Sequence, residues 1–191
     1  TPIFDKQNVL SVGALAIAPS DHSILYAGTG EGNPRNDASI GDGIYKSIDA
    51  GGHWANVGLP DSEKFARIVV DPRNADLVYA CALGREWGPN EERGLFKTID
   101  GGRNWKKVLY KDDGVGAADV VFDPSNPKIV YAALWAARRP PWSVGGSYLA
   151  PGSGLYKSTD GGNTWHQLTG GLPSWKEKVG RIGIGIAPSR P

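Results

Sequence analysis

The chain has 191 residues, of which 21 are lysine or arginine and 20 are aspartate or glutamate, so its formal net charge at pH 7 is only +1. Basic residues form no long run and acidic residues are interspersed among them, which argues against a nucleic-acid partner. No apolar stretch reaches the length of a membrane span, and the 27 glycines and 14 prolines suit an all-β domain with many turns.

The chain opens with a segment that matches a strand expected later in the sequence. Residues 1–5 read Thr-Pro-Ile-Phe-Asp and correspond to residues 106–110, Lys-Lys-Val-Leu-Tyr, which follow a Trp. We therefore expect residues 1–10 to form the last strand of a unit that precedes the first complete one.

A pair of short apolar runs separated by a Pro-containing turn then occurs three times. The pairs cover residues 15–20 with 24–27, 68–72 with 77–80, and 120–124 with 129–132. Runs rich in β-branched and aromatic residues on either side of such a turn predict two antiparallel strands in each repeat.

Each pair is followed by a third strand and a repeated turn of eight residues. The expected strands are 43–46, 94–97 and 154–157, and the turns are 47–54, 98–105 and 158–165. In each turn an Asp can accept hydrogen bonds from backbone amides ahead of it, glycines adopt positive φ without steric cost, and the final Trp is an apolar plug. The residues with this structural role are Ser47, Asp49, Gly51, Trp54, Thr98, Asp100, Gly102, Trp105, Ser158, Asp160, Gly162 and Trp165.

The repeating unit is thus four strands long, which predicts an all-β chain in which antiparallel four-stranded units stack as the blades of a β-propeller. We expect complete blades at residues 11–60, 65–110 and 116–174, and the first strand of a following blade at 179–191. Propellers close with about four to eight blades. The sequence therefore predicts a partial propeller, completed by blades from the same longer chain or by homo-oligomerisation.

The repeated turn, with its spacing Ser/Thr-x-Asp-x-Gly-x-x-Trp, resembles the Asp-box, or BNR repeat. This motif occurs in sialidases, xyloglucanase-type glycoside hydrolases, sortilin-type receptors and secreted bacterial BNR-repeat proteins described as glycosyl-hydrolase-like. Residues 28–33 and 87–94 look most similar to the last group. The resemblance implies a β-propeller fold and a secreted or periplasmic location.

Binding residues are expected in the long, irregular loops between the second and third strands, at residues 28–43, 83–93 and 134–153. Aromatic rings beside charged groups suit sugar recognition, because a ring packs on apolar C–H faces while polar groups pair with hydroxyls. The ligand-binding candidates are Arg35, Arg85, Trp87, Trp135, Arg138 and Trp142. The alternative is that Trp87 and Trp135 are plugs between blades and that the charges are a solvated rim.

Hydrolysis of a glycoside would need two carboxyl groups roughly 5 to 10 Å apart. The candidates by location alone are Glu31, Asp42, Glu86, Glu91 and Glu92, and none of them sits in a diagnostic motif. The resemblance to sialidases and xyloglucanases is confined to the repeated turns, so their catalytic residues have no identifiable counterparts here. The catalytic residues therefore stay unknown.

Other reactive side chains favour structural roles. We expect no cofactor, and no metal site from the three histidines, which do not cluster: His22, His53 and His166. The single Cys81 is expected to be a small buried residue within a strand. Arg67 and Arg181 each precede an inner strand, and a structural pairing with Asp119 or a backbone carbonyl is favoured over anion binding.

Two functions remain open at this point. The first is a scaffold or binding surface for a protein or glycan, not catalytic by itself. The alternative is a fragment of a glycoside hydrolase that acts on a polysaccharide through a carboxylate pair on the propeller rim. Whether the chain is part of an enzyme is undecided.

Overall fold

A computed structural model describes residues 2–33, 35, 37–139 and 150–189, and these residues form an all-β fold, as the sequence predicts. The helical content of this described part is limited to two single-turn 3-10 helices, Pro60–Ser62 and Trp175–Glu177. It contains no helix long and apolar enough to cross a membrane.

The strands form three antiparallel four-stranded sheets, one for each predicted blade. The first sheet contains β1 (Val12–Ala18), β2 (Asp21–Thr29), β3 (Ile44–Ser47) and β4 (Ala55–Asn56). The second contains β5 (Phe65–Asp71), β6 (Asn74–Ala82), β7 (Gly94–Thr98) and β8 (Lys106–Leu109). The third contains β9 (Gly116–Phe122), β10 (Val130–Trp135), β11 (Gly154–Ser158) and β12 (His166–Leu168).

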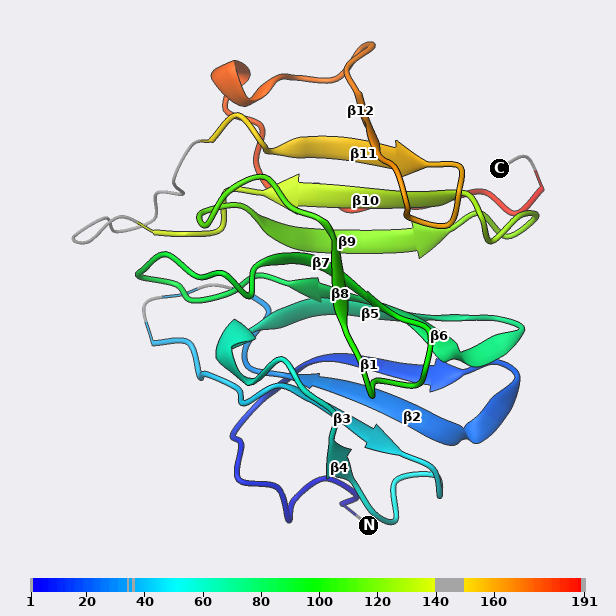
Figure 1. Cartoon of the computed structure of the whole chain (residues 1–191). Coiled ribbons are helices and arrows are strands. Elements are labelled where there is room, and N and C mark those ends of the chain that lie inside the picture. The colour runs from blue at the N-terminus through cyan, green and yellow to red at the C-terminus, as the bar shows by residue number, and fades with distance from the viewer. Residues whose placement is uncertain (1, 34, 36, 140–149, 190–191) are drawn as a thin grey trace.

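The three sheets stack on one another, with the first strands β1, β5 and β9 side by side in sequence order (Figure 1). This arrangement is the arc of a β-propeller. The loops that follow β2, β6 and β10 all lie on the same side of the stack, and we call this side the rim (Figure 1).

The hydrophobic core fills the two junctions between the sheets. Along β6, Val78 and Ala80 are buried toward the first sheet, whereas Tyr79 and Cys81 are buried toward the third. This alternation follows from the two-residue period of a strand. The middle sheet is therefore buried on both faces, and the prediction of Cys81 as a small buried residue is confirmed.

The repeated turns are held by the side chains of their first and third residues. In the second turn, Thr98 Oγ1 donates to Asp100 Oδ1 at 2.7 Å and accepts from the amide of Gly102 at 3.0 Å. Asp100 Oδ1 also accepts from the amide of Asn104 at 2.9 Å. The turns that begin at Ser47 and Ser158 have the same contacts.

The segments at either end contain no assigned strand between residues 2 and 10 or between 179 and 189. The sequence predicts a strand in each. Neither segment forms a ladder of backbone hydrogen bonds with a neighbouring strand, which is what a β-strand requires. The N-terminal segment nevertheless lies against the first sheet, because the carbonyl of Ile3 accepts the indole N–H of Trp54 at 2.8 Å.

Candidate functional site

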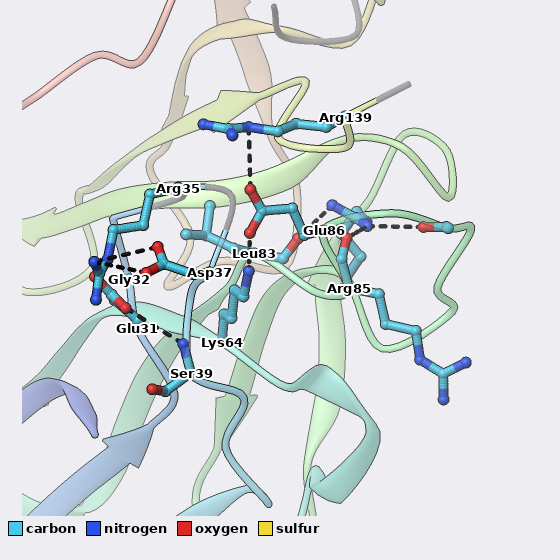
Figure 2. Close-up of polar contacts among 12 residues, drawn as sticks. Glu31, Gly32, Arg35, Asp37, Ser39, Lys64, Leu83, Arg85, Glu86 and Arg139 are labelled. Atoms are coloured by element: carbon cyan, nitrogen blue, oxygen red, sulfur yellow. Dashed lines mark hydrogen bonds and ion pairs between the residues drawn. The ribbon is translucent and has the colours of Figure 1, made fainter. Parts of the chain in front are cut away.

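The rim contains a buried ion network that joins three segments flanking the second and third sheets. Lys64 lies just before β5, Glu86 is in the loop after β6, and Arg139 is in the loop after β10. Figure 2 shows the Glu86 carboxylate between the two cations: Lys64 Nζ contacts Oε2, and Arg139 Nε lies 3.0 Å from Oε1. Each carboxylate oxygen thus faces a cation, although Oε1 accepts no hydrogen bond from the described residues. The side chains of Lys64 and Glu86 are only 3% and 4% exposed.

A pocket of about 180 Å³ lies beside this network, between the loops that follow β2 and β6. It is lined by Ala38, Ile40, Glu63, Lys64, Arg85, Glu86, Trp87 and Gly88. Trp87 is 46% exposed, so a broad apolar surface faces solvent at the edge of the pocket. Arg85 Nε lies 3.2 Å from Glu63 Oε1, which places a paired cation and carboxylate in the same lining.

The loop that carries Trp87 is held in shape by a fully buried arginine. The guanidinium of Arg93 donates to the carbonyls of Leu83, Arg85 and Gly88. Burial lowers the pKa of Arg93 to about 10, which still leaves it protonated at neutral pH. The backbone on both sides of Trp87 is therefore held by Arg93.

Glu31 holds the neighbouring loop and stays ionised. Arg35 Nε donates to Glu31 Oε1 at 2.6 Å, and Arg35 Nη1 lies 3.2 Å from Asp37 Oδ1 (Figure 2). The amide of Ser39 donates to Glu31 Oε2 at 3.3 Å. The hydrogen bond from Arg35 is the main cause that lowers the pKa of Glu31, and the ammonium of Lys64 acts in the same direction. A lowered pKa does not suit a general acid near neutral pH.

Of the five carboxylate candidates, Glu86 lines the pocket and the other four do not. Asp42 accepts the hydroxyl of Tyr45 at 2.7 Å, at the start of β3. Glu92 Oε2 accepts the amide of Asp61 at 2.9 Å, and burial is the main cause that raises the pKa of Glu92. Glu91 is exposed. The structure therefore places Glu31 and Glu86 near one cation, Lys64, and keeps the other three apart from them.

The ligand-binding candidates expected in the third loop lie in different environments. Trp135, expected in the loop, is the last residue of β10, and it packs against the buried cluster of Leu83, Ala118 and Ala137 between two sheets. This is the structural plug that the sequence analysis leaves open as an alternative. Arg138 Nη1 lies 3.9 Å from Asp113 Oδ1. Trp142 falls outside the described residues.

The sequence does not identify Lys64 and Glu63 as rim residues, and it places Arg93 and Arg139 in the rim loops without indicating their contacts. Lys64 and Glu63 precede a strand and belong to none of the three irregular loops, and no local pattern marks a lysine that will be buried. The double arginine at 138–139 was visible, but which of the two would reach Glu86 depends on packing between sheets.

Arg67 and Arg181 make the kind of structural pairing that the sequence favours. Arg67 Nε lies 3.8 Å from Asp119 Oδ1. Arg181 Nη1 donates to the carbonyl of Gly32 at 3.0 Å and to Asn33 Oδ1 at 2.6 Å. Residue 181 is thereby tied to the rim loop that follows β2.

Comparisons with known proteins relate the chain to β-propeller glycosidases. No protein-family model matches the sequence. It is 25% identical over 183 residues to a probable oligoxyloglucan-reducing end-specific xyloglucanase of Neosartorya fischeri, covering 90% of this chain and 19% of that protein. It is 27% identical over 184 residues to a xyloglucanase of Hypocrea jecorina, covering 83% of this chain and 20% of that protein.

The same fold is found in a crystal structure of an ancestral GH74 enzyme, with a TM-score of 0.57 and 23% identity over 84% of this chain and 19% of that one. The chain therefore spans about a fifth of the length of the curated relatives that it matches.

Proposed function

We propose that this chain is a segment of a glycoside-hydrolase-like β-propeller and that its rim binds a xyloglucan-type polysaccharide. The support from sequence is the similarity to two proteins named as xyloglucanases over most of the chain. The support from geometry is an exposed Trp87 at the edge of a pocket that also contains ion-paired side chains.

Trp87 is the observation on which the proposal rests. Its ring offers an apolar surface for the C–H face of a sugar, while Arg85 and Glu63 offer a donor and an acceptor for hydroxyl groups. Because Arg93 holds the backbone of this loop, little backbone entropy is lost when a sugar packs on the ring. These features favour recognition of a neutral, hydroxyl-rich ligand.

Catalysis in this proposal requires carboxyl groups beyond those that the rim offers. Glu86 is buried with a cation facing each oxygen, and Glu31 is held ionised by Arg35. Neither arrangement suits a general acid facing a substrate. The acid and base of a hydrolase would then come from other blades, with this segment supplying part of the substrate-binding surface.

The same observation favours a second candidate, a propeller that binds a glycan or protein without cleaving it. In either case the repeated turns are proposed to be Asp-boxes, the blades 11–60, 65–110 and 116–174 to be structural units of a larger ring, and the protein to be secreted or periplasmic.

Calorimetric titration with a xyloglucan heptasaccharide tests the binding proposal. We expect Trp87→Ala to weaken binding by about tenfold, the effect of losing about 1.4 kcal/mol of aromatic packing. The matched control is Tyr110→Ala, because Tyr110 is also an exposed aromatic residue, at 40%, but does not line the pocket. Equal affinities of wild type and Trp87→Ala would reject the rim as the binding surface.

Release of reducing sugar from xyloglucan separates the two candidates. Cleavage by a protein that contains this chain, lost when the rim is altered, favours the hydrolase. Binding without cleavage favours the non-catalytic propeller.

A further inference from the structure

A second cavity, of about 280 Å³, lies between the repeated turns of the second and third sheets. Apolar lining comes from Ile99, Trp105 and Val108, and polar lining from Asn104, Lys106 and Asn163, with Lys97 and Asp100 completing it. The strands β7 and β11 run from the rim loops to these turns, so the cavity lies at the opposite end of the sheets from the pocket beside Trp87.

A change in one tryptophan contact distinguishes this junction from the others. The indole N–H of Trp54 donates to the carbonyl of Ile3 at 2.8 Å, and that of Trp105 donates to the carbonyl of Val57 at 2.8 Å. Each of these bonds ties a repeated turn to the segment before it. The indole N–H of Trp165 instead donates to Gly162, within its own turn, at 3.2 Å. The corresponding link from Trp165 to Val108 is therefore missing, and the cavity occupies this junction.

Three polar groups of the lining have unused hydrogen-bonding capacity. Asn104 uses its amide nitrogen to reach Asp100 at 2.7 Å, and Asn163 uses its own to reach the carbonyl of Asp160 at 2.7 Å. Within the described ranges, neither amide oxygen accepts a hydrogen bond, and the ammonium of Lys106 has no hydrogen bond or ion pair. Two acceptors and one donor thus stand beside an apolar surface.

We propose that this cavity is a second sugar subsite, which binds a single neutral hexose unit of the polysaccharide that the rim binds; the inference rests on the proposed function. Hydroxyl groups donate to the amide oxygens of Asn104 and Asn163 and accept from Lys106, while a C–H face packs on Ile99 or Trp105.

The charges of the lining favour a neutral ligand over an anion. The carboxylate of Asp100 lies in the same lining and repels an anion. The ammonium of Lys97 keeps its charge but already donates to the carbonyl of Gly161 at 2.7 Å, and two lysines against one carboxylate attract a phosphate or sulfate only weakly. The volume is just below the usual range for ligand pockets, about 300 to 1,000 Å³, which fits one ring and not a long oligosaccharide.

Amide NMR of the 191-residue chain during titration with the xyloglucan heptasaccharide tests this subsite. We expect saturable shifts at Ile99, Lys106 and Asn163. In Lys106→Ala, the affinity measured from these shifts should be about fivefold weaker, since one hydrogen bond to the ligand is lost. Lys128→Ala is the matched control, because Lys128 is exposed and does not line the cavity.

The outcomes distinguish the two proposals. Shifts around Trp87 alone would overturn the second subsite and leave the rim proposal intact. Shifts at Ile99, Lys106 and Asn163 without any around Trp87 would support the subsite and reject the rim. Absence of shifts at these three residues, or equal affinity in Lys106→Ala, overturns the inference.

Discussion

Lys64 and Glu86 form an ion pair that is almost completely removed from solvent, with side chains only 3% and 4% exposed. The two residues come from different loops, and Arg139 from the third sheet approaches the same carboxylate. Removing charges from water is costly, so such a pair is stable only while each partner is present. The network therefore couples the correct position of one rim loop to that of the next.

Replacing Lys64 should destabilise the protein strongly. We expect Lys64→Met to lower the free energy of unfolding by about 3 kcal/mol, because a buried carboxylate then keeps Arg139 as its single cation. Urea unfolding at pH 7 measures the change. In the control Arg85→Ala, a half-exposed pair with Glu63 is lost, and the expected change is below about 1 kcal/mol. Similar losses of unfolding free energy in both variants would mean that the buried Lys64–Glu86 pair contributes no more to stability than an exposed pair.

The N-terminal segment should contribute to stability through one aromatic residue. Phe4 makes edge-to-face contacts with Tyr45 at 5.4 Å and with Trp54 at 5.0 Å between ring centroids. We expect Phe4→Ala to lower the free energy of unfolding by about 2 kcal/mol, since two such contacts and some buried area are lost.

Leu10→Ala is the matched control for this segment. Leu10 is 93% exposed, so its truncation should change stability by less than about 0.5 kcal/mol. A neutral Phe4→Ala would show that residues 2–10 are not needed to cover the first sheet.

The repeated strands were predictable because the position of each one along the chain depends on local sequence. The run 154–157 predicts a strand, and the structure has β11 at Gly154–Ser158. The same holds for the three turns, where spacing alone places the Asp ahead of the amides that it binds. Alternation and turn chemistry act over a few residues, so a single sequence displays them.

The rim was predictable only in part, because it depends on packing between sheets. The sequence identifies Trp87 and Glu86 as residues of one loop, but it does not show that Lys64 would be buried against Glu86. Trp135 was expected to share the loop environment, yet one more residue of strand pairing, with Gly116, places it at the end of β10. Contacts of this kind join residues far apart in the chain and leave no local pattern.

Removing the Asp of a repeated turn should lower stability without changing ligand affinity at the pocket beside Trp87, which Asp100 does not line. Asp100 accepts hydrogen bonds from Thr98 and from both nitrogens of Asn104, and Asp100→Ala leaves those donors to water alone. We expect a clear fall in melting temperature. Asp37→Ala, which removes an exposed rim carboxylate that pairs with Arg35 among the described residues, should cause a smaller fall. An unchanged melting curve for Asp100→Ala would rule out the structural role.

The same hydrogen bonds predict how stability depends on pH in the acid range. They lower the pKa of Asp100 to about 2, mainly through Asn104, and that of Asp49 to about 2, mainly through His53. The pKa of Asp160 is also well below its ordinary value, mainly because of Thr164. An unfolded Asp titrates near 3.9. Since the folded state binds fewer protons, this stabilisation is complete above about pH 4 and is lost progressively as the pH falls toward 2.

Asp100→Asn isolates one of these groups, because asparagine keeps the acceptor oxygen but does not titrate. We expect the difference in unfolding free energy between wild type and Asp100→Asn to be constant above about pH 4 and to shrink as the pH falls toward 2. Urea unfolding at pH 6, 4, 3 and 2.5 measures it, and other carboxylates cancel because both proteins contain them. A difference that stays constant over this range would mean that the Asp100 carboxylate is not stabilised by its turn.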